Sequence, residues 1–188
     1  MTQARNISDV PVAAYAVAGD FCRIFAEDMS GLYLLSFLLT GDRVKAEQCF
    51  VSGLEDSVGA NRVFKEWARS WARRAIIQNA IRMMQPTRER SASLTASFAA
   101  GEVEISDKLA PVLGLKTFER FVFVMSVLEG YSDQDCKTLL ACSRQDIVRA
   151  RLQALKHMAT DAEKALAPDV AVGAGALLVQ QRFAAKTA

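Results

Sequence analysis

Residues that bind metals or carry out catalysis are scarce in this sequence. It has one histidine, His157, and four cysteines with no C-x-x-C pair among them. This spacing does not suggest a zinc site. There is also no glycine-rich phosphate loop and no pairing of a nucleophile with a general base. The sequence therefore predicts no metal, no cofactor and no enzymatic activity.

Long hydrophobic runs and a secretory signal are missing as well. The longest late apolar run, Val170 to Val179, has ten residues, two of them glycine, whereas a helix that crosses a bilayer needs about 20. The first residues, MTQARNISDV, lack a basic head followed by an apolar stretch. We therefore expect a cytoplasmic protein away from membranes, with four reduced thiols. The cysteines are Cys22, Cys49, Cys136 and Cys142.

Sustained two-residue alternation of apolar and polar residues, the pattern of a half-buried strand, is absent from the sequence. Apolar residues instead recur at steps of three and four, which is the spacing of an amphipathic helix. The first such series is Phe21, Ile24, Phe25, Met29, Leu32, Leu35 and Leu39. It ends in the turn Thr40-Gly41-Asp42, whose Asp42 can cap the next helix. The sequence predicts an all-α fold.

A polar tract at residues 85–108 divides the helical pattern into two parts. It contains Pro86, many serines and threonines, and little periodicity, as is typical of a linker. We therefore predict two small helical domains, at 1–84 and 109–160, joined by this linker.

The second predicted domain contains a strongly apolar helix, Phe118 to Leu128, which ends at Gly130. Beyond it, residues 161–188 form an Ala-rich tail with room for one more helix. The sequence leaves three roles open for this tail: folding back on either domain, extending the last helix, or binding a regulator.

Two helix-start signals stand eleven positions apart in the second domain. The pattern S-x-x-D begins at Ser132 and again at Ser143, and each copy offers a serine oxygen to the free N–H groups of a helix start. The two signals predict a short helix from Ser132 to about Ala141 and a longer one from Ser143 to about Met158. Helices joined by so tight a turn match the helix-turn-helix arrangement, in which the second helix lies in the DNA major groove.

On a helical wheel, the second of these helices has an apolar arc and a polar side. The arc that we expect to be buried consists of Ile147, Ala154, Leu155 and Met158, with Val148 and Leu152 at its margin. The predicted DNA contacts at the exposed start and on the polar side are Ser143, Arg144, Gln145, Arg149 and Lys156, with Gln153 beside them. Arg and Gln side chains can pair with guanine and adenine edges. A helical hairpin with a solvated charged face is the alternative.

Positive charge concentrates in residues 62–90, which hold eight basic and two acidic residues, a net charge of +6, whereas residues 1–61 carry −4. On a helix that starts near residue 62, four of the cations form a strip: Arg62, Lys65, Arg69 and Arg73. Such a strip can bind the DNA backbone by neutralising phosphates. We interpret Trp67 and Trp71 as core residues because they share the apolar face. Stacking on unpaired bases is the alternative.

Three sets of residues, in this order, carry a family resemblance. They are Leu39-Thr40-Gly41-Asp42-Arg43 with Ala46-Glu47; Phe64-x-x-Trp67 with Ala72-Arg73; and Leu115, Arg120, Val122-Phe123, Leu128-Glu129-Gly130-x-Ser132, Leu139-Leu140 and Ser143. Together they resemble the extracytoplasmic-function sigma factors of bacterial RNA polymerase, over about residues 20–84 and 109–158. The first set is similar to the turn that leads into the family's polymerase-binding helix. The second is similar to the segment that captures the downstream promoter element. The third is similar to the carboxy-terminal DNA-binding domain.

The resemblance implies a transcription initiation protein that is not an enzyme and needs no cofactor. Its first domain would dock on the RNA polymerase core and help to open promoter DNA, and its second would read the upstream promoter element through the helix that starts at Ser143. The implied polymerase contacts are Glu47, Gln48 and Leu54. The implied DNA contacts in the first domain are Arg69, Arg73, Arg74 and Gln78. An anti-sigma factor or another regulatory protein is a further implied partner.

The chain departs from the family pattern at several positions. The departures are Gln48 in place of an acid, Val51-Ser52 in place of Gln-Glu, Arg74 and Gln78 in place of Asn and Asp in the melting segment, Ala141 in place of a turn glycine, and Arg151 in place of a core Leu. These departures argue against promoter melting more strongly than against DNA binding.

Two other interpretations stay open. One is a helix-turn-helix transcriptional regulator that acts as a dimer without docking on polymerase. The other is an all-α interaction protein whose DNA face is vestigial.

Overall fold

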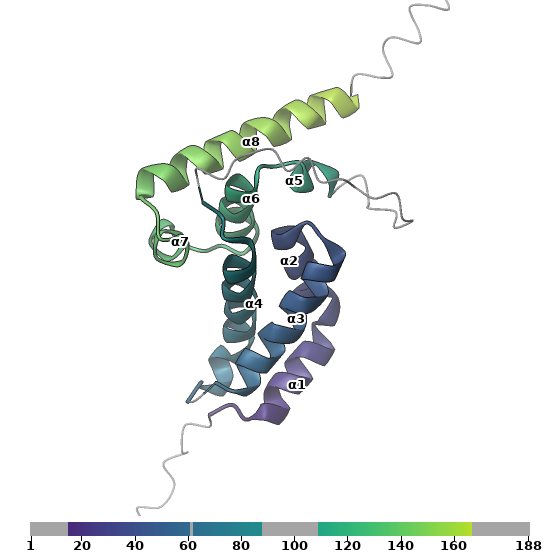
Figure 1. The fold of residues 1–188 in the computed structure, drawn as a ribbon, viewed down its shortest axis with the longest axis vertical. Helices are drawn as coiled ribbons and strands as arrows, with labels where there is room; N and C mark the ends of the chain where they lie inside the picture. The colour runs from purple at the N-terminus through teal and green to yellow at the C-terminus, as the bar shows by residue number, and fades with distance from the viewer. Residues whose placement is uncertain (1–14, 61, 88–108, 167–188) are drawn as a thin grey trace, which may run out of the picture. The chain divides into compact units, whose positions relative to one another are not determined.

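The computed structural model describes residues 15–60, 62–87 and 109–166 (Figure 1). In these ranges all regular secondary structure is helical, and the only β feature is an isolated bridge between Tyr15 and Phe64. The predicted all-α fold is confirmed. None of the described helices combines the length and the apolar character needed to span a bilayer. The chain divides into two compact units, Met1–Thr87 and Arg88–Ala188.

The first unit is built from helices that pack around α3 and α4. In chain order these are α1 (Ala18–Glu27), α2 (Met29–Thr40), α3 (Arg43–Val58), the 3-10 turn η1 (Lys65–Trp67) and α4 (Ala68–Met84). Helix α3 packs against α2 and α4, and α1 lies against both α3 and α4. The interior of this unit is formed by fully buried side chains, among them Phe21, Leu32, Leu39, Ile76 and Ile77.

The turn predicted at Thr40-Gly41-Asp42 is confirmed. Gly41 ends α2 in the left-handed region, with φ +67°, a conformation that glycine adopts without steric cost. The Asp42 carboxylate accepts a hydrogen bond from the Lys45 backbone N–H at 2.8 Å, so it caps α3 as expected.

The apolar series that begins at Phe21 belongs to two helices rather than one. Asp28 leaves the helical conformation, with φ −111° and ψ 30°, and separates α1 from α2. Its carboxylate accepts a hydrogen bond from Arg73 at 3.0 Å. The spacing of apolar residues does not reveal the break because Phe25 before it and Leu32 after it are both buried.

Gly53 marks a close approach between α3 and α4. A methyl group added there would lie 2.7 Å from Ile76 Cγ1 and 3.4 Å from Ile76 Cα. We expect Gly53→Ala to destabilise the protein, because overpacking costs about 1–3 kcal/mol and exceeds the gain of roughly 1 kcal/mol in helix propensity. The matched control is Gly19→Ala in α1, where a methyl group meets nothing within 4 Å and should be stabilising. Urea unfolding of both variants tests this, and equal stabilisation would contradict it.

The second unit is assembled on α8. Its elements are α5 (Ala110–Leu113), α6 (Thr117–Phe123), the π-helical segment η2 (Val124–Leu128), α7 (Asp133–Leu140) and α8 (Arg144–Leu166). Helices α5, α6 and α7 all pack against α8. The fully buried side chains include Phe121, Val122, Met125, Ile147 and Ala154. The predicted apolar helix up to Leu128 is confirmed, with a π-helical last turn followed by Gly130 at φ +70°.

Helix α8 is longer than predicted. It continues to Leu166 instead of ending near Met158, so the first six residues of the predicted tail are helical. Alanine, glutamate, lysine and leucine at 162–166 are strong helix formers. The remainder of that tail (167–188) and most of the predicted linker (88–108) lie outside the described residues.

Candidate nucleic-acid interface

A short elbow connects α7 to α8, and both of the predicted helix starts are confirmed. At the first, the Asp135 N–H donates to Ser132 Oγ at 3.1 Å. At the second, the Asp146 N–H donates to Ser143 Oγ at 3.2 Å, and the Ser143 N–H donates back to the Asp146 carboxylate at 3.3 Å. This reciprocal pair is a capping box. The capping bonds fix the direction in which α8 leaves the turn.

Ala141 ends α7 in a conformation that suits glycine better. Its φ is +48° and its ψ is 45°, the left-handed region, which costs a residue with a Cβ about 1–2 kcal/mol. Glycine, which the resemblance leads one to expect at this turn, would adopt the conformation without that cost, so alanine here has a measurable structural cost.

We expect Ala141→Gly to raise the free energy of unfolding by about 1 kcal/mol. The reciprocal control is Gly130→Ala, at φ +70° with nothing within 4 Å of the added methyl group, which should be destabilising for the same reason. Thermal and urea unfolding of both variants give the comparison. A destabilised Ala141→Gly variant would contradict the assigned turn conformation.

Asp133 holds the start of α8 against α7. Its carboxylate pairs with Arg144 Nε at 3.3 Å and also with the Arg151 guanidinium. Arg151 Nε donates to Ser126 Oγ in η2 at 3.0 Å. At Arg151 the sequence resemblance led us to expect a buried leucine, and the ion pair with Asp133 neutralises the arginine charge at the edge of the core. Hydrogen bonding from Arg151, more than any other contact, lowers the pKa of Asp133.

The lowered pKa of Asp133 predicts a dependence of stability on pH. The folded protein favours the ionised carboxylate, so this contribution is present above the unfolded pKa and is lost as pH falls through the folded value, below about pH 4. Asp133→Asn should therefore lower the urea midpoint at neutral pH, and the difference from the wild type should shrink towards pH 3. A difference that stays constant with pH would show that the carboxylate charge is not responsible.

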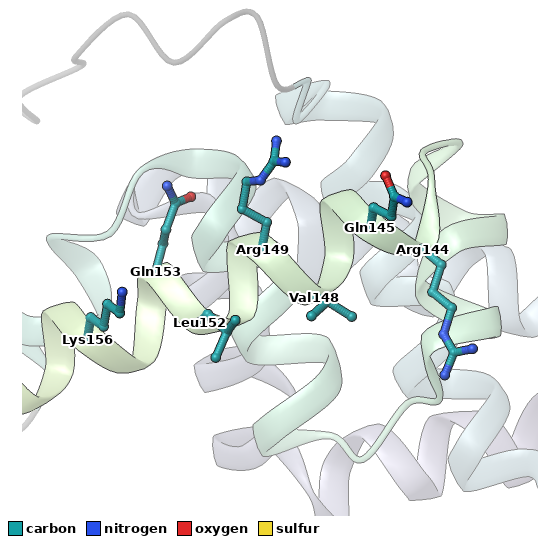
Figure 2. A pocket seen from close by; sticks show the side chains of 7 residues that line it. All are labelled: Arg144, Gln145, Val148, Arg149, Leu152, Gln153 and Lys156. Atoms are coloured by element: carbon teal, nitrogen blue, oxygen red, sulfur yellow. The ribbon is translucent and has the colours of Figure 1, made fainter.

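The outer surface of α8 carries a polar stripe (Figure 2). Gln145, Arg149, Gln153 and Lys156 are spaced by four, four and three residues and are all exposed. Gln145, Arg149 and Gln153 point to the same side of the helix in Figure 2. Ser143 is also exposed at the helix start. Arg144 is exposed too, but its side chain turns towards Asp133.

An apolar stripe of Val148, Leu152 and Leu155 runs beside the polar one. Leu155 was expected in the buried arc but is 44% exposed, and Val148 and Leu152 are exposed to a similar degree. The buried side of α8 is instead formed by Ile147, Ala150 and Ala154. The small alanines let α6 approach closely, and the wider aliphatic side chains are left outside.

The basic strip predicted in the first unit is paired with two acids of α1 and with Asp28, which follows that helix. Arg69 binds Glu27 at 2.5 Å, Arg73 binds Asp28 at 3.0 Å, and Lys65 binds Asp20 at 3.6 Å. The expected helix from Arg62 is also wrong. Arg62 has φ +58°, and the helix proper begins at Ala68 after η1. The strip is therefore not one row of unpaired cations.

The interpretation of the tryptophans as core residues is wrong. Trp67 is 59% exposed and Trp71 is 41% exposed. The helix buries Ala68, Ala72 and Ala75 instead, so the first two turns of α4 pack through small side chains. The repeat of alanine at steps of four and three was a signal in the sequence for this close packing.

The exposed tryptophans share a face of α4 with two of the predicted DNA contacts. Positions 67, 71, 74 and 78 follow one another at steps of four, three and four, so Arg74 and Gln78 continue the line of Trp67 and Trp71. Gln78 is exposed and Arg74 is partly buried. No acidic side chain among the described residues is seen to pair with Arg74. This face, rather than the ion-paired strip, is open to a ligand.

The predicted polymerase contacts lie on α3 beside a row of valines. Glu47 and Gln48 are exposed, Leu54 is partly buried, and Glu47 pairs with Arg43 within the helix. Val44, Val51 and Val58 are exposed at intervals of seven residues, which is the heptad spacing of residues that contact a partner helix. Their seven-residue spacing is visible in the sequence, so periodicity is the signal that could have found this surface.

A scan against protein-family models finds no match for the chain, and a search of curated proteins finds none either. Over the described ranges, no group of three or more His, Cys, Asp or Glu residues is arranged to hold a metal ion.

Proposed function

We propose that this chain is a sigma-factor-like protein of transcription initiation, which binds promoter DNA through α8 and the RNA polymerase core through α3. The observation that carries the proposal is the polar stripe of Gln145, Arg149, Gln153 and Lys156, exposed on a helix that follows a capped elbow. The resemblance of the sequence to extracytoplasmic-function sigma factors supports the same conclusion.

The composition of the polar stripe favours duplex DNA as its ligand. A major groove about 12 Å wide admits an α-helix. Arg149 can donate two hydrogen bonds to a guanine edge, and Gln145 can donate to and accept from an adenine edge. Lys156 lies further along the helix and can neutralise a phosphate. This set of groups combines base reading near the helix start with backbone contact towards its end.

The outer face of α4 favours contact with unpaired bases. Stacking of a base on an aromatic side chain contributes about 1–3 kcal/mol and tolerates any sequence. Trp67 and Trp71 are exposed for such contacts, and Arg74 beside them can meet a phosphate. This arrangement would allow the first unit to hold separated strands despite the departures at Arg74 and Gln78 from the family pattern.

The valine row of α3 favours a helical partner. The family's docking helix carries an acid where this chain has Gln48, and a Gln-Glu pair where it has Val51-Ser52. Here the exposed surface is apolar at Val44, Val51 and Val58, so burial of aliphatic side chains would replace part of the lost charge attraction. We infer that the affinity of this chain for polymerase falls less with rising salt concentration than the affinity of a charged interface would.

Copurification of the full chain with core polymerase, followed by run-off transcription, tests the proposal. Wild type should associate with the core and direct transcripts from a defined start. Val51→Asp should abolish association because it puts a charge in the valine row, while Val17→Asp, also at an exposed valine of the first unit, should not.

Absence of both association and promoter-directed transcript would overturn the proposed function. A full chain that binds duplex DNA as a dimer and ignores polymerase would instead support a helix-turn-helix regulator. If a titration with duplex DNA at low salt shows no binding, the interpretation as an all-α interaction protein is the one that remains.

A further inference from the structure

The apolar stripe of α8 is not explained by DNA binding. Duplex DNA offers charged phosphates and polar base edges, and its main apolar group in the major groove is the thymine methyl. Val148, Leu152 and Leu155 are all exposed at steps of four and three, which is the spacing of anchors that bind an apolar segment. The occupant of this stripe must therefore offer aliphatic side chains.

We propose that the carboxy-terminal segment of the same chain, residues 170–179, folds back and covers this stripe. The segment reads VAVGAGALLV and contains no charged residue, so it matches the stripe in polarity. It also begins only four residues after α8 ends at Leu166, which gives it a high effective concentration at the helix.

The length of the chain allows this contact. Leu155 lies eleven residues before the end of α8, about 16 Å along the helix at roughly 1.5 Å per residue. The eleven residues from 167 to Leu177 can span roughly 36 Å when extended. Pro168, two positions after Leu166, has no backbone N–H to donate to a further helical turn. Leu177, Leu178 and Val179 can thus reach the stripe.

Covering the apolar stripe would also bring the segment beside the polar one. Leu152 and Gln153 are adjacent on α8, and both line the same surface hollow, together with Arg149 (Figure 2). The contact itself does not depend on the proposed role in transcription, and it can be tested without DNA.

Photo-crosslinking of the full chain tests the contact. A benzophenone amino acid in place of Leu152 should crosslink to residues 170–179 of the same chain, with a yield that does not change on dilution. The same group in place of Gln134, at an exposed position of α7, should not crosslink to this segment. Crosslinks between two copies, crosslinks to other regions, or no crosslink at Leu152 would each overturn the proposal.

A second pair of variants checks that the apolar segment is responsible. Leu178→Asp should abolish the crosslink from position 152 and should speed hydrogen exchange of the α8 amides around residues 148–155. Ala185→Asp adds the same charge outside the apolar run and should change neither. Equal effects of the two variants would contradict a specific contact by residues 170–179. None of these readouts requires that the protein bind DNA or polymerase.

Discussion

Replacing Arg144, Gln145 and Arg149 together by alanine is expected to lower the affinity for the proposed ligand, promoter duplex, by about 100-fold or more. Each bidentate contact to a base edge contributes roughly 1–3 kcal/mol of discrimination, and about 1.4 kcal/mol corresponds to tenfold in affinity. The remaining binding should be weak, sensitive to salt and indifferent to sequence, because it would depend on phosphate contacts alone. Fluorescence anisotropy with cognate and scrambled duplexes measures both effects.

The fold of this triple variant should be retained. Arg144 is the only one of the three seen to pair with Asp133, and Arg151 holds the same carboxylate. Loss of an exposed ion pair costs at most about 1 kcal/mol. The control removes the same side chains elsewhere, at Arg23, Arg43 and Gln134, all of which are exposed. A control that weakens binding as much as the α8 variant would show that only net charge matters.

Replacing Phe121 by alanine is expected to unfold the second unit or bring it close to unfolding. The Phe121 ring is completely buried in α6, which packs on α8. Deleting a buried ring costs about 3–5 kcal/mol, a large part of the roughly 5–15 kcal/mol that stabilises a typical domain. Far-UV circular dichroism during urea unfolding should show early loss of part of the helical signal.

The two tryptophans allow the two units to be followed separately. Both Trp67 and Trp71 belong to the first unit, so tryptophan fluorescence reports on that unit alone. The Phe121→Ala change should therefore shift the circular dichroism transition more than the fluorescence transition. Leu128→Ala, at an exposed position of the second unit, should shift neither by more than about 0.5 kcal/mol. A Phe121→Ala variant as stable as Leu128→Ala would contradict the assigned core.

Local signals in the sequence were reliable predictors of where helices begin and end. The serine caps at Ser132 and Ser143, the Asp42 cap and the turn at Gly41 all have the predicted geometry. Each depends on groups within four residues of one another, so the physics that decides it is already present in a short stretch of chain.

Burial was harder to predict where two faces of a helix are both apolar. In α4 the tryptophans and the alanines have similar periodicity, and hydrophobicity alone favours burying the larger rings. The structure buries Ala68, Ala72 and Ala75 and exposes Trp67 and Trp71. The same choice recurs in α8, where Ala150 and Ala154 are inside and Leu155 is outside. The space available between helices decided both cases.

The sequence by itself determined the helical class, the elbow before α8 and the polar row that follows it, because capping and periodicity act between near neighbours. Only the tertiary structure decided that Arg69 and Arg73 are paired with Glu27 and Asp28, since these acids are more than 40 positions away along the chain. It also decided which apolar face of α4 and α8 is left for a ligand. These outcomes depend on how closely neighbouring helices approach one another. That distance is set by residues far apart along the chain, so no single stretch of sequence predicts it.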